Sequence, residues 1–378
     1  MDFDLTPDQE LLQQCVHRLL ADTYAFDQRK QYLQSDAGWS RALWRQFAEM
    51  GLLGLPFAAA DGGFDGGAVE IMLTMESMGR VLSLEPYFAT VILAGTCLRR
   101  GADPAQRARW LPPLIDGRET FAFAHVERAA RYDLARVETR AQYEGGAWRL
   151  HGRKDFVVHG DTADKFIVSA RSGGEHRDAG GISLFVVDAA AVRRRGYSTQ
   201  DGTRAADVIF DGVRVADQDL IGAPGGSMDL IDTVADIGMA ALAAEAVGVM
   251  TRAHELTIEY MKARKQFGTT IGSFQALQHR AVDMLVMIEQ ARSMAMYATM
   301  MSEHADPAKR RQASSAAKAY IGRAGRFVGE QAIQLHGGIG VTEECAVGHY
   351  YRRLTMIDVL FGDSTHHLTR VANAGELP

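Results

Sequence analysis

Residues 121–223 carry the pattern of a β-sheet and lie between two longer segments that carry the pattern of α-helices. Within this block, the segments FIVSA, ISLFVVD and ADVIFDGVRV are short and rich in β-branched and aromatic residues, and turn sequences such as RSGGEHRDAGG separate them. Because helices and strands are segregated along the chain, we expect an α+β fold. The predicted domains are an N-terminal helical domain (1–120), a middle β domain (121–223) and a C-terminal helical domain (224–378).

Capping signals and a glycine-rich loop organise the first domain. Thr6 can cap a helix, Pro7 suits its first position, and Gln9 stands where a capping box has Glu or Gln. The sequence AAADGGFDGG at residues 58–67 predicts a loop, after which a helical pattern continues to about Pro112.

Two long helices are predicted after the β block. The first has an apolar stripe with spacings of three and four, formed by Leu242, Ala246, Val249, Ala253, Leu256 and Tyr260. The second is predicted over residues 274–301, with four residues facing inward: Ala281, Leu285, Ile288 and Ala295. Long antiparallel helices of this kind build a helix bundle.

Charge and cysteine usage exclude several classes of partner. The 378 residues have a formal net charge of -6, which gives no reason to expect nucleic acid. The three consecutive arginines at 193–195 predict a solvated turn, although an anionic ligand could use them. The three cysteines are widely separated and indicate neither a disulfide framework nor a metal site. No signal-peptide core opens the chain and no uninterrupted apolar run approaches the about 20 residues of a membrane span, so we expect a cytoplasmic protein that does not bind a membrane.

Two short motifs in the C-terminal domain have residue types that suit a nucleotide cofactor. In YMKARKQFGTTIGSFQALQH (260–279), Arg264 could pair with a phosphate and the phenylalanines could cover a heteroaromatic ring. In QLHGGIGVTEE (334–344), an amide and a Gly-Gly pair would let backbone approach a phosphate or a ring. Taken alone, Arg264 reads as a surface residue at a helix end, and His336 as a structural histidine.

Together with LPFAAADGGFDGG and the order of the domains, these motifs resemble the acyl-CoA dehydrogenase family over nearly the whole chain. The resemblance implies an N-terminal helical domain, a middle β-barrel-like domain and a C-terminal four-helix bundle. It also implies FAD as cofactor, an acyl-CoA substrate, an electron-acceptor flavoprotein, and a homotetramer or heterotetramer. The residues that would bind a neighbouring subunit's FAD are Arg264, Gln266, Phe267, Phe274, Gln334, Leu335 and Gly338.

The positions that would serve the chain's own flavin depart from the family pattern. The family's Thr-Glu-Pro-Gly-x-Gly-Ser-Asp string corresponds to VERAARYD (126–133), which keeps only Glu127 and Asp133. The hydroxyl expected at the first position is replaced by Val126. The family's Trp-x-Thr corresponds to FVV, in which Phe156 can stack but Val158 cannot donate a hydrogen bond.

Both family positions for the catalytic base lack a carboxylate. In MIDVLFGDSTHH (356–367), Phe361 stands where the family has glutamate, and Gly238 occupies the alternative position on the long helix. Three acids lie near these positions in sequence and could in principle replace the base: Asp363, Asp236 and Glu245. A general base must lie within hydrogen-bond reach of the proton it removes, so the catalytic residue stays unassigned.

This pattern resembles the small, non-catalytic subunits of bacterial heterotetrameric acyl-CoA dehydrogenases. We therefore expect a subunit that holds FAD in trans for a glutamate-bearing partner that dehydrogenates acyl-CoA thioesters. One alternative is a self-sufficient homotetramer with a relocated base such as Asp363. The same fold would also suit a non-redox scaffold, or a flavin oxidase or monooxygenase.

Overall fold

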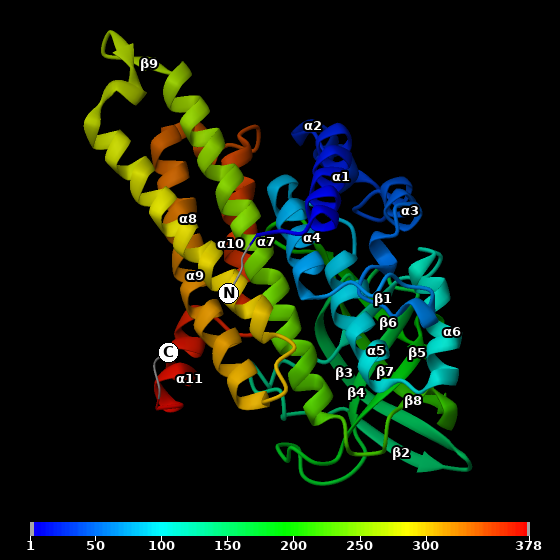
Figure 1. Cartoon of the computed structure of the whole chain (residues 1–378). Helices are drawn as coiled ribbons and strands as arrows, with labels where there is room; N and C mark the ends of the chain where they lie inside the picture. The colour runs from blue at the N-terminus through cyan, green and yellow to red at the C-terminus, as the bar shows by residue number, and fades with distance from the viewer. Residues whose placement is uncertain (1–3, 376–378) are drawn as a thin grey trace. The chain divides into compact units, whose positions relative to one another are not determined.

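The computed structural model describes residues 4–375, and its elements follow the predicted order of helices, strands and helices (Figure 1). The chain folds into two compact units. One contains Met1–Gln31, Ala68–Ser83 and Met239–Pro378, and the other contains Tyr32–Gly67 and Leu84–Gly238. Each unit therefore combines separate stretches of the chain, and the predicted domain boundaries at 120 and 223 stay a prediction.

The N-terminal region is helical, and its first helix starts at the predicted cap. For α1 (Pro7–Thr23), Thr6 Oγ1 accepts a hydrogen bond from the backbone N–H of Gln9 (3.3 Å), while Gln9 Oε1 accepts one from the N–H of Thr6 (3.0 Å). The capping box is thus confirmed. The other helices are α2 (Phe26–Gln34), α3 (Arg41–Glu49), α4 (Ala68–Val81), the π-helix η3 (Phe88–Ala94), α5 (Gly95–Gly101) and α6 (Pro104–Ile115).

The middle region forms one sheet of eight strands in the order β6-β7-β3-β2-β4-β5-β8, with β1 parallel to β4. The strands are β1 (Phe121–Ala124), β2 (Arg140–Glu144), β3 (Ala147–Val158), β4 (Lys165–Arg171), β5 (Ile182–Asp188), β6 (Arg193–Ser198), β7 (Arg204–Ala216) and β8 (Leu220–Ile221). All three predicted strand segments fall within β4, β5 and β7. Their buried side chains, among them Phe166, Phe185 and Val208, form the core of this region.

The C-terminal region is a bundle of α7 (Met228–Ala263), α8 (Gln275–Met301), α9 (Pro307–His336) and α10 (Ala346–Val359), followed by α11 (Ser364–Asn373) (Figure 1). Helix α9 packs against α8, α10 and α11. Two glycines bring α4 close to α7: a Cβ at Gly79 would lie 2.1 Å from the carbonyl oxygen of Glu245, and one at Gly248 would lie 1.9 Å from that of Glu76. Only glycine permits this approach.

One residue predicted for the core of the bundle is not buried. Ala281, Ile288 and Ala295 are buried as predicted, but the prediction for Leu285 is wrong, because this side chain is 44% exposed. The buried stripe of α8 instead passes through Met284, because the spacing of three from Ala281 keeps that residue on the inner face. Leu285 is exposed together with its neighbours Val282 and Val286.

Helix α7 is long and apolar enough, by length and composition, to cross a membrane, which the sequence pattern did not lead us to expect. However, 94% of its most apolar window is buried inside the protein. Burial of this kind is that of a core helix in a bundle.

Candidate functional site

A short hairpin between α7 and α8 carries the first nucleotide-binding motif. Strand β9 (Lys265–Gln266) pairs antiparallel with β10 (Thr269–Thr270), and the turn residues Phe267 and Gly268 both have positive φ, 55° and 81°. Two successive positive φ values are typical of the tight two-residue hairpin turn. The N–H of Ile271 donates to the carbonyl oxygen of Arg264 (2.9 Å) and closes the base of the hairpin.

The side chains of this hairpin are available to a ligand. Phe267 is 91% exposed, and its ring meets the edge of Phe274 at 6.3 Å between centroids. Arg264 is exposed and forms no ion pair with any residue among 4–375. Gln266 uses its amide only locally, donating from Nε2 to the carbonyl oxygen of Lys265 (2.9 Å). An exposed aromatic pair beside an unpaired guanidinium suits the adenine and phosphate groups of a nucleotide.

The second motif lies at the turn that ends α9. Gln334 is exposed in the last helical turn, and Gly337 ends the helix with φ 66° and ψ -147°, a conformation that favours glycine. A Cβ placed at Gly337 or Gly338 would meet nothing within 4 Å, so a ligand could approach this backbone closely. Leu335 is only 5% exposed, which limits its contribution to backbone contacts.

The structure brings the two motifs to one cavity. This cavity of about 450 Å³ is lined by Ala263 at the foot of the hairpin and by His336 and Ile339 of the second motif. The ring of His336 stacks on Tyr260 at 4.4 Å, and its Nδ1 donates to the carbonyl oxygen of Ala332 (2.8 Å). Burial lowers the pKa of His336, which agrees with its predicted structural role. Both motifs thus border this cavity, and together they are called the candidate nucleotide surface, although none of the seven predicted FAD-binding residues lines the cavity itself.

In the middle domain, the two altered flavin positions also lie together. Phe156 has φ 53° and sits in a β-bulge of β3, between Lys154 and Val157, where the register with β7 shifts. In this bulge the N–H of Asp155 donates to the carbonyl oxygen of Val126 (2.8 Å). The backbone of the two segments is thus held together, while the side chains at both altered positions are apolar.

The two residues kept from the family string have structural tasks. Glu127 is buried and binds Lys154 Nζ at 2.6 Å, and it also accepts hydrogen bonds from the N–H groups of Glu138 (2.7 Å) and Thr139 (3.0 Å). Burial alone would raise the pKa of Glu127, but Lys154 and these hydrogen bonds outweigh it and lower the pKa. Asp133 Oδ1 accepts from the N–H of Ala135 (3.1 Å) and holds a turn.

The position of the missing glutamate lies in the turn between α10 and α11. Phe361 has φ 60°, and the following Gly362 has φ 116°, so this turn has an unusual backbone. The buried His367 fixes it: Nε2–H donates to the carbonyl oxygen of Phe361 (3.0 Å), which leaves Nδ1 to accept from Ser315 Oγ (3.2 Å). Burial lowers the pKa of His367 to about 3, so this imidazole is neutral.

A buried lysine supports the same turn. Lys318 is fully buried, and its Nζ donates to the carbonyl oxygens of Ile357 (2.5 Å) and Asp358 (3.0 Å) at the end of α10. Burial lowers the pKa of Lys318 to about 8, an effect that the nearby carboxylates of Asp358 and Asp363 reduce. A cation at the end of a helix satisfies carbonyl groups that have no partner within the helix.

Two of the acids considered as replacement bases are committed to other contacts. Asp363 caps α11, and its Oδ1 accepts a hydrogen bond from the N–H of His366 (2.8 Å). Glu245 is buried and forms a bidentate pair with Arg353, at 2.6 and 2.7 Å. The third acid, Asp236, is 2% exposed in α7. Two of the three carboxylates thus already hold structural contacts, and the third is buried.

Several residues of these sites were not predicted. His367, Ser315 and Lys318 carry no recognisable spacing, because their contacts join α9 to a turn about 40 to 50 residues later in the chain. The string STHH and the lysine in an otherwise apolar stretch of α9 were the only signals. Tyr260 was predicted only as part of an apolar stripe.

Comparison with known proteins supports the assignment suggested by this geometry. Family models match the N-terminal (residues 6–118), middle (122–213) and C-terminal (228–375) domains of acyl-CoA dehydrogenases. Acyl-CoA dehydrogenase FadE12 of Mycobacterium tuberculosis is 30% identical over 315 residues, which cover 81% of this chain and 80% of FadE12. The chain belongs to the acyl-CoA dehydrogenase family.

Solved structures of this family share the whole architecture. A variant of the Tcur3481-Tcur3483 steroid ACAD superposes with a TM-score of 0.87, 27% identity and 97% coverage of each chain. The FAD complex of PigA superposes with a TM-score of 0.90, 24% identity and 99% coverage of each chain, a likeness that concerns the fold. The predicted α+β fold, with helical, β-sheet and helical-bundle domains, is confirmed.

Proposed function

We propose that this chain is the subunit of an acyl-CoA dehydrogenase assembly that holds FAD for a homologous, glutamate-bearing partner. One observation carries the proposal: the position of the base is Phe361, in a turn whose nearby carboxylate, Asp363, caps a helix. In contrast, the hairpin with Arg264 and Phe267 is exposed, and its guanidinium has no ion-pair partner among the described residues. The chain is thus equipped to hold a cofactor and not to remove a substrate proton.

Each part of the candidate nucleotide surface has a role in this proposal. Arg264 would pair with the diphosphate of FAD, and the exposed rings of Phe267 and Phe274 would lie against its adenine. Gln266, Gln334, Gly338 and the backbone of Leu335 would complete the contact. FAD, when bound, supplies an acceptor for the hydride that leaves the β-carbon of the acyl thioester.

The middle-domain site for the chain's own flavin should bind FAD more weakly than the C-terminal nucleotide surface does. Val126 and Val158 cannot donate the hydrogen bonds that hydroxyl groups would give, each worth about 0.5–1.5 kcal/mol. The partner would therefore provide the middle domain that faces the flavin ring and the glutamate that takes the α-proton. The similarity to a steroid ACAD that is named with two components supports a two-component assembly.

The remaining parts of the proposal follow from the reaction. The assembly dehydrogenates an acyl-CoA thioester between the α- and β-carbons and passes the electrons to a separate acceptor flavoprotein. We place it in the cytoplasm, as a heterotetramer with the partner subunit.

Flavin retention tests the proposal. The chain is purified alone and after co-expression with a homologue that bears the glutamate, and bound flavin per chain is measured from visible absorbance after denaturation. We expect substoichiometric flavin in the isolated chain and stable flavin in the mixed assembly. Full flavin occupancy of the isolated chain, with no gain on co-expression, would contradict the proposed division of roles.

A further inference from the structure

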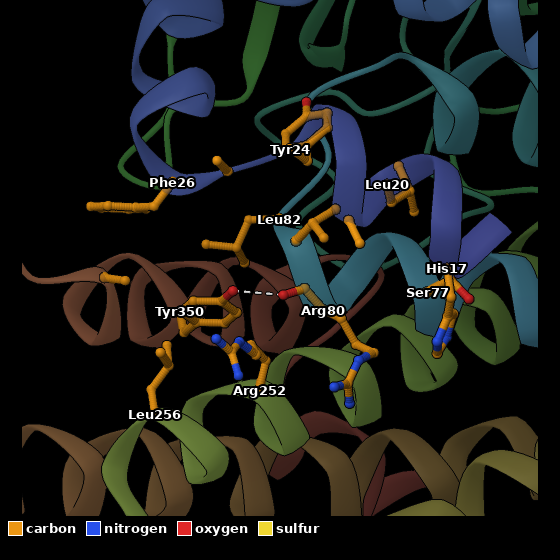
Figure 2. Close-up of a pocket in the computed structure, with 14 residues that line it drawn as sticks. His17, Leu20, Tyr24, Phe26, Ser77, Arg80, Leu82, Arg252, Leu256 and Tyr350 are labelled. Carbon is orange, nitrogen blue, oxygen red and sulfur yellow. Dashed lines mark hydrogen bonds between the residues drawn. The ribbon is translucent and has the colours of Figure 1, made fainter. Parts of the chain in front are cut away.

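A second cavity lies among α1, α4, α7 and α10, within the unit that contains the bundle (Figure 2). Its volume is about 440 Å³. Leu256 and Ala346 also line the cavity beside the candidate nucleotide surface, but none of the 14 lining residues belongs to either nucleotide motif or to the turn around Phe361, and none is Asp or Glu. This cavity therefore calls for a separate explanation.

Two arginines line the cavity with part of their hydrogen-bonding capacity unused. Nη2 of Arg80 binds the carboxylate of Glu255 at 2.8 and 2.9 Å. Nη1 of Arg252 binds Glu255 (3.0 Å) and Glu259 (3.2 Å). Neither glutamate lines the cavity, and the other guanidinium nitrogens of Arg80 and Arg252 have no hydrogen-bond partner within residues 4–375. The unused guanidinium N–H groups can therefore donate into the cavity, whereas the carboxylates of Glu255 and Glu259 do not line it.

A histidine adds a buried nitrogen that has no partner in the described part of the chain. Nε2 of His17 is buried and has no hydrogen-bond partner among the described residues. Burial, together with the positive charge of Arg80, lowers the pKa of His17, so the ring is neutral and one of its nitrogens carries a proton. Figure 2 shows the guanidinium of Arg80 between Arg252, which lies beside Tyr350, and His17, which lies beside Ser77. A buried polar atom without a partner is costly unless a ligand or water satisfies it.

Two hydroxyl groups of the lining are already satisfied. The hydroxyl of Tyr350 donates to the carbonyl oxygen of Arg80 (2.6 Å), and Ser77 Oγ donates to the carbonyl oxygen of Leu73 (2.7 Å). Much of the remaining wall is apolar, with side chains that include Leu20, Phe26, Leu82 and Leu256. Figure 2 shows Leu20 and Leu82 on the side of the cavity opposite the guanidinium of Arg80.

We propose that this cavity binds an amphipathic carboxylate, such as a medium-chain fatty acid. The carboxylate would accept hydrogen bonds from Arg80, Arg252 and His17, and the alkyl chain would lie against the leucines. The volume falls within the about 300–1,000 Å³ of small-molecule sites. A compact inorganic anion would use the donors but leave the apolar wall in contact with water.

Calorimetric titration of the purified chain with octanoate tests this site. Arg252→Gln removes one positive charge from the lining, and Leu256→Trp fills part of the cavity while both guanidinium groups stay in place. Each variant should weaken octanoate binding about 10-fold or more. In Arg252→Gln the carboxylate loses a hydrogen bond to a charged group, and the free energy of such a bond corresponds to at least this factor in affinity. In Leu256→Trp the larger side chain excludes the alkyl chain from the cavity. Arg326→Gln, at an exposed arginine of α9, is the matched control and should bind as the wild type does.

Two further ligands separate carboxylate recognition from simpler explanations. Octylamine has the same chain without the negative charge, and inorganic phosphate has the charge without the chain. Both should bind at least about 10-fold more weakly than octanoate. Equal binding of either ligand, absence of octanoate binding, or unchanged octanoate binding in Leu256→Trp would overturn the proposal. Leu256→Trp keeps both Arg80 and Arg252. It therefore still tests whether octanoate occupies the cavity if Arg252→Gln fails to fold.

Discussion

Nε2 of His367 lies 3.0 Å from the carbonyl oxygen of Phe361 and donates a hydrogen bond to it. This bond holds the backbone at the position where the family pattern has a catalytic glutamate. The turn keeps its shape through His367 and Lys318, which act on carbonyl groups and need no carboxylate at position 361. The turn is therefore held in one conformation by His367 and Lys318 although it lacks the catalytic glutamate.

The buried His367 should make stability depend on pH. Its pKa is about 3 in the folded protein and about 6.5 when exposed, so below pH 6.5 the unfolded chain binds a proton that the native chain does not. The free energy of unfolding should then fall by about 1.4 kcal/mol per pH unit from this group alone. Between pH 7 and pH 5, urea unfolding should show a loss about 2 kcal/mol larger in the wild type than in His367→Gln. The control variant His279→Gln, at an exposed site, should keep the pH dependence of unfolding of the wild type. If His367→Gln also keeps it, the pH dependence does not come from His367.

Asp363 should matter as a helix cap. Asp363→Ala should lower the free energy of unfolding by about 1 kcal/mol, because the N–H of His366 loses its acceptor. Asp363→Asn should have little effect, since asparagine caps equally well. Thermal and urea unfolding of both variants provide the comparison, and equal destabilisation by Asn and Ala would show that the charge, not the cap, is what matters.

Glu127 and Lys154 should behave as a coupled buried pair. Lys154→Met leaves the carboxylate of Glu127 buried without its cation, which should cost about 3–5 kcal/mol in the free energy of unfolding. The double variant Lys154→Met/Glu127→Gln should recover part of this loss in urea unfolding, because the uncompensated charge is gone. A double variant that is less stable than Lys154→Met would contradict a structural role for Glu127 as the partner of Lys154.

Local signals predicted much of the fold, but long-range contacts decided the rest. The cap at Thr6 and the strand 182–188 could be predicted because capping and β-propensity act over a few residues. Leu285 was placed inward wrongly, since a helix pattern with apolar residues on two adjacent faces does not show which face the neighbouring helices cover.

The same limit applies to the site. The residues of each nucleotide motif lie within a short stretch of sequence, so the sequence alone was enough to predict them. The retention of Glu127 looked like a remnant of flavin binding, and only the structure shows its partner, Lys154, 27 residues away. The positive φ of Phe361 also has no sequence signal, because tertiary contacts of its carbonyl group impose it.

Arg264 should contribute to FAD binding without supporting the fold. Arg264→Ala removes an exposed guanidinium, so the free energy of unfolding should change by less than about 0.5 kcal/mol. Affinity of the assembly for FAD should fall by about 1.5–3 kcal/mol, the magnitude of a hydrogen bond to a charged group. Fluorescence titration of the deflavinated assembly measures this change, with Arg326→Ala as the exposed control. An unchanged affinity in Arg264→Ala would remove this residue from the proposed site.

Steady-state acyl-CoA dehydrogenation by the isolated chain, compared with the co-expressed assembly, tests the partner-subunit account most directly. With FAD added in excess, the isolated chain should be slower by about 10²–10⁴-fold, the usual effect of a missing general base. In the assembly, Phe361→Glu in this chain should add little, whereas removal of the partner's glutamate should abolish turnover. Steady turnover by the isolated chain that Asp363→Asn eliminates while flavin stays bound would instead identify Asp363 as a relocated base and contradict the account.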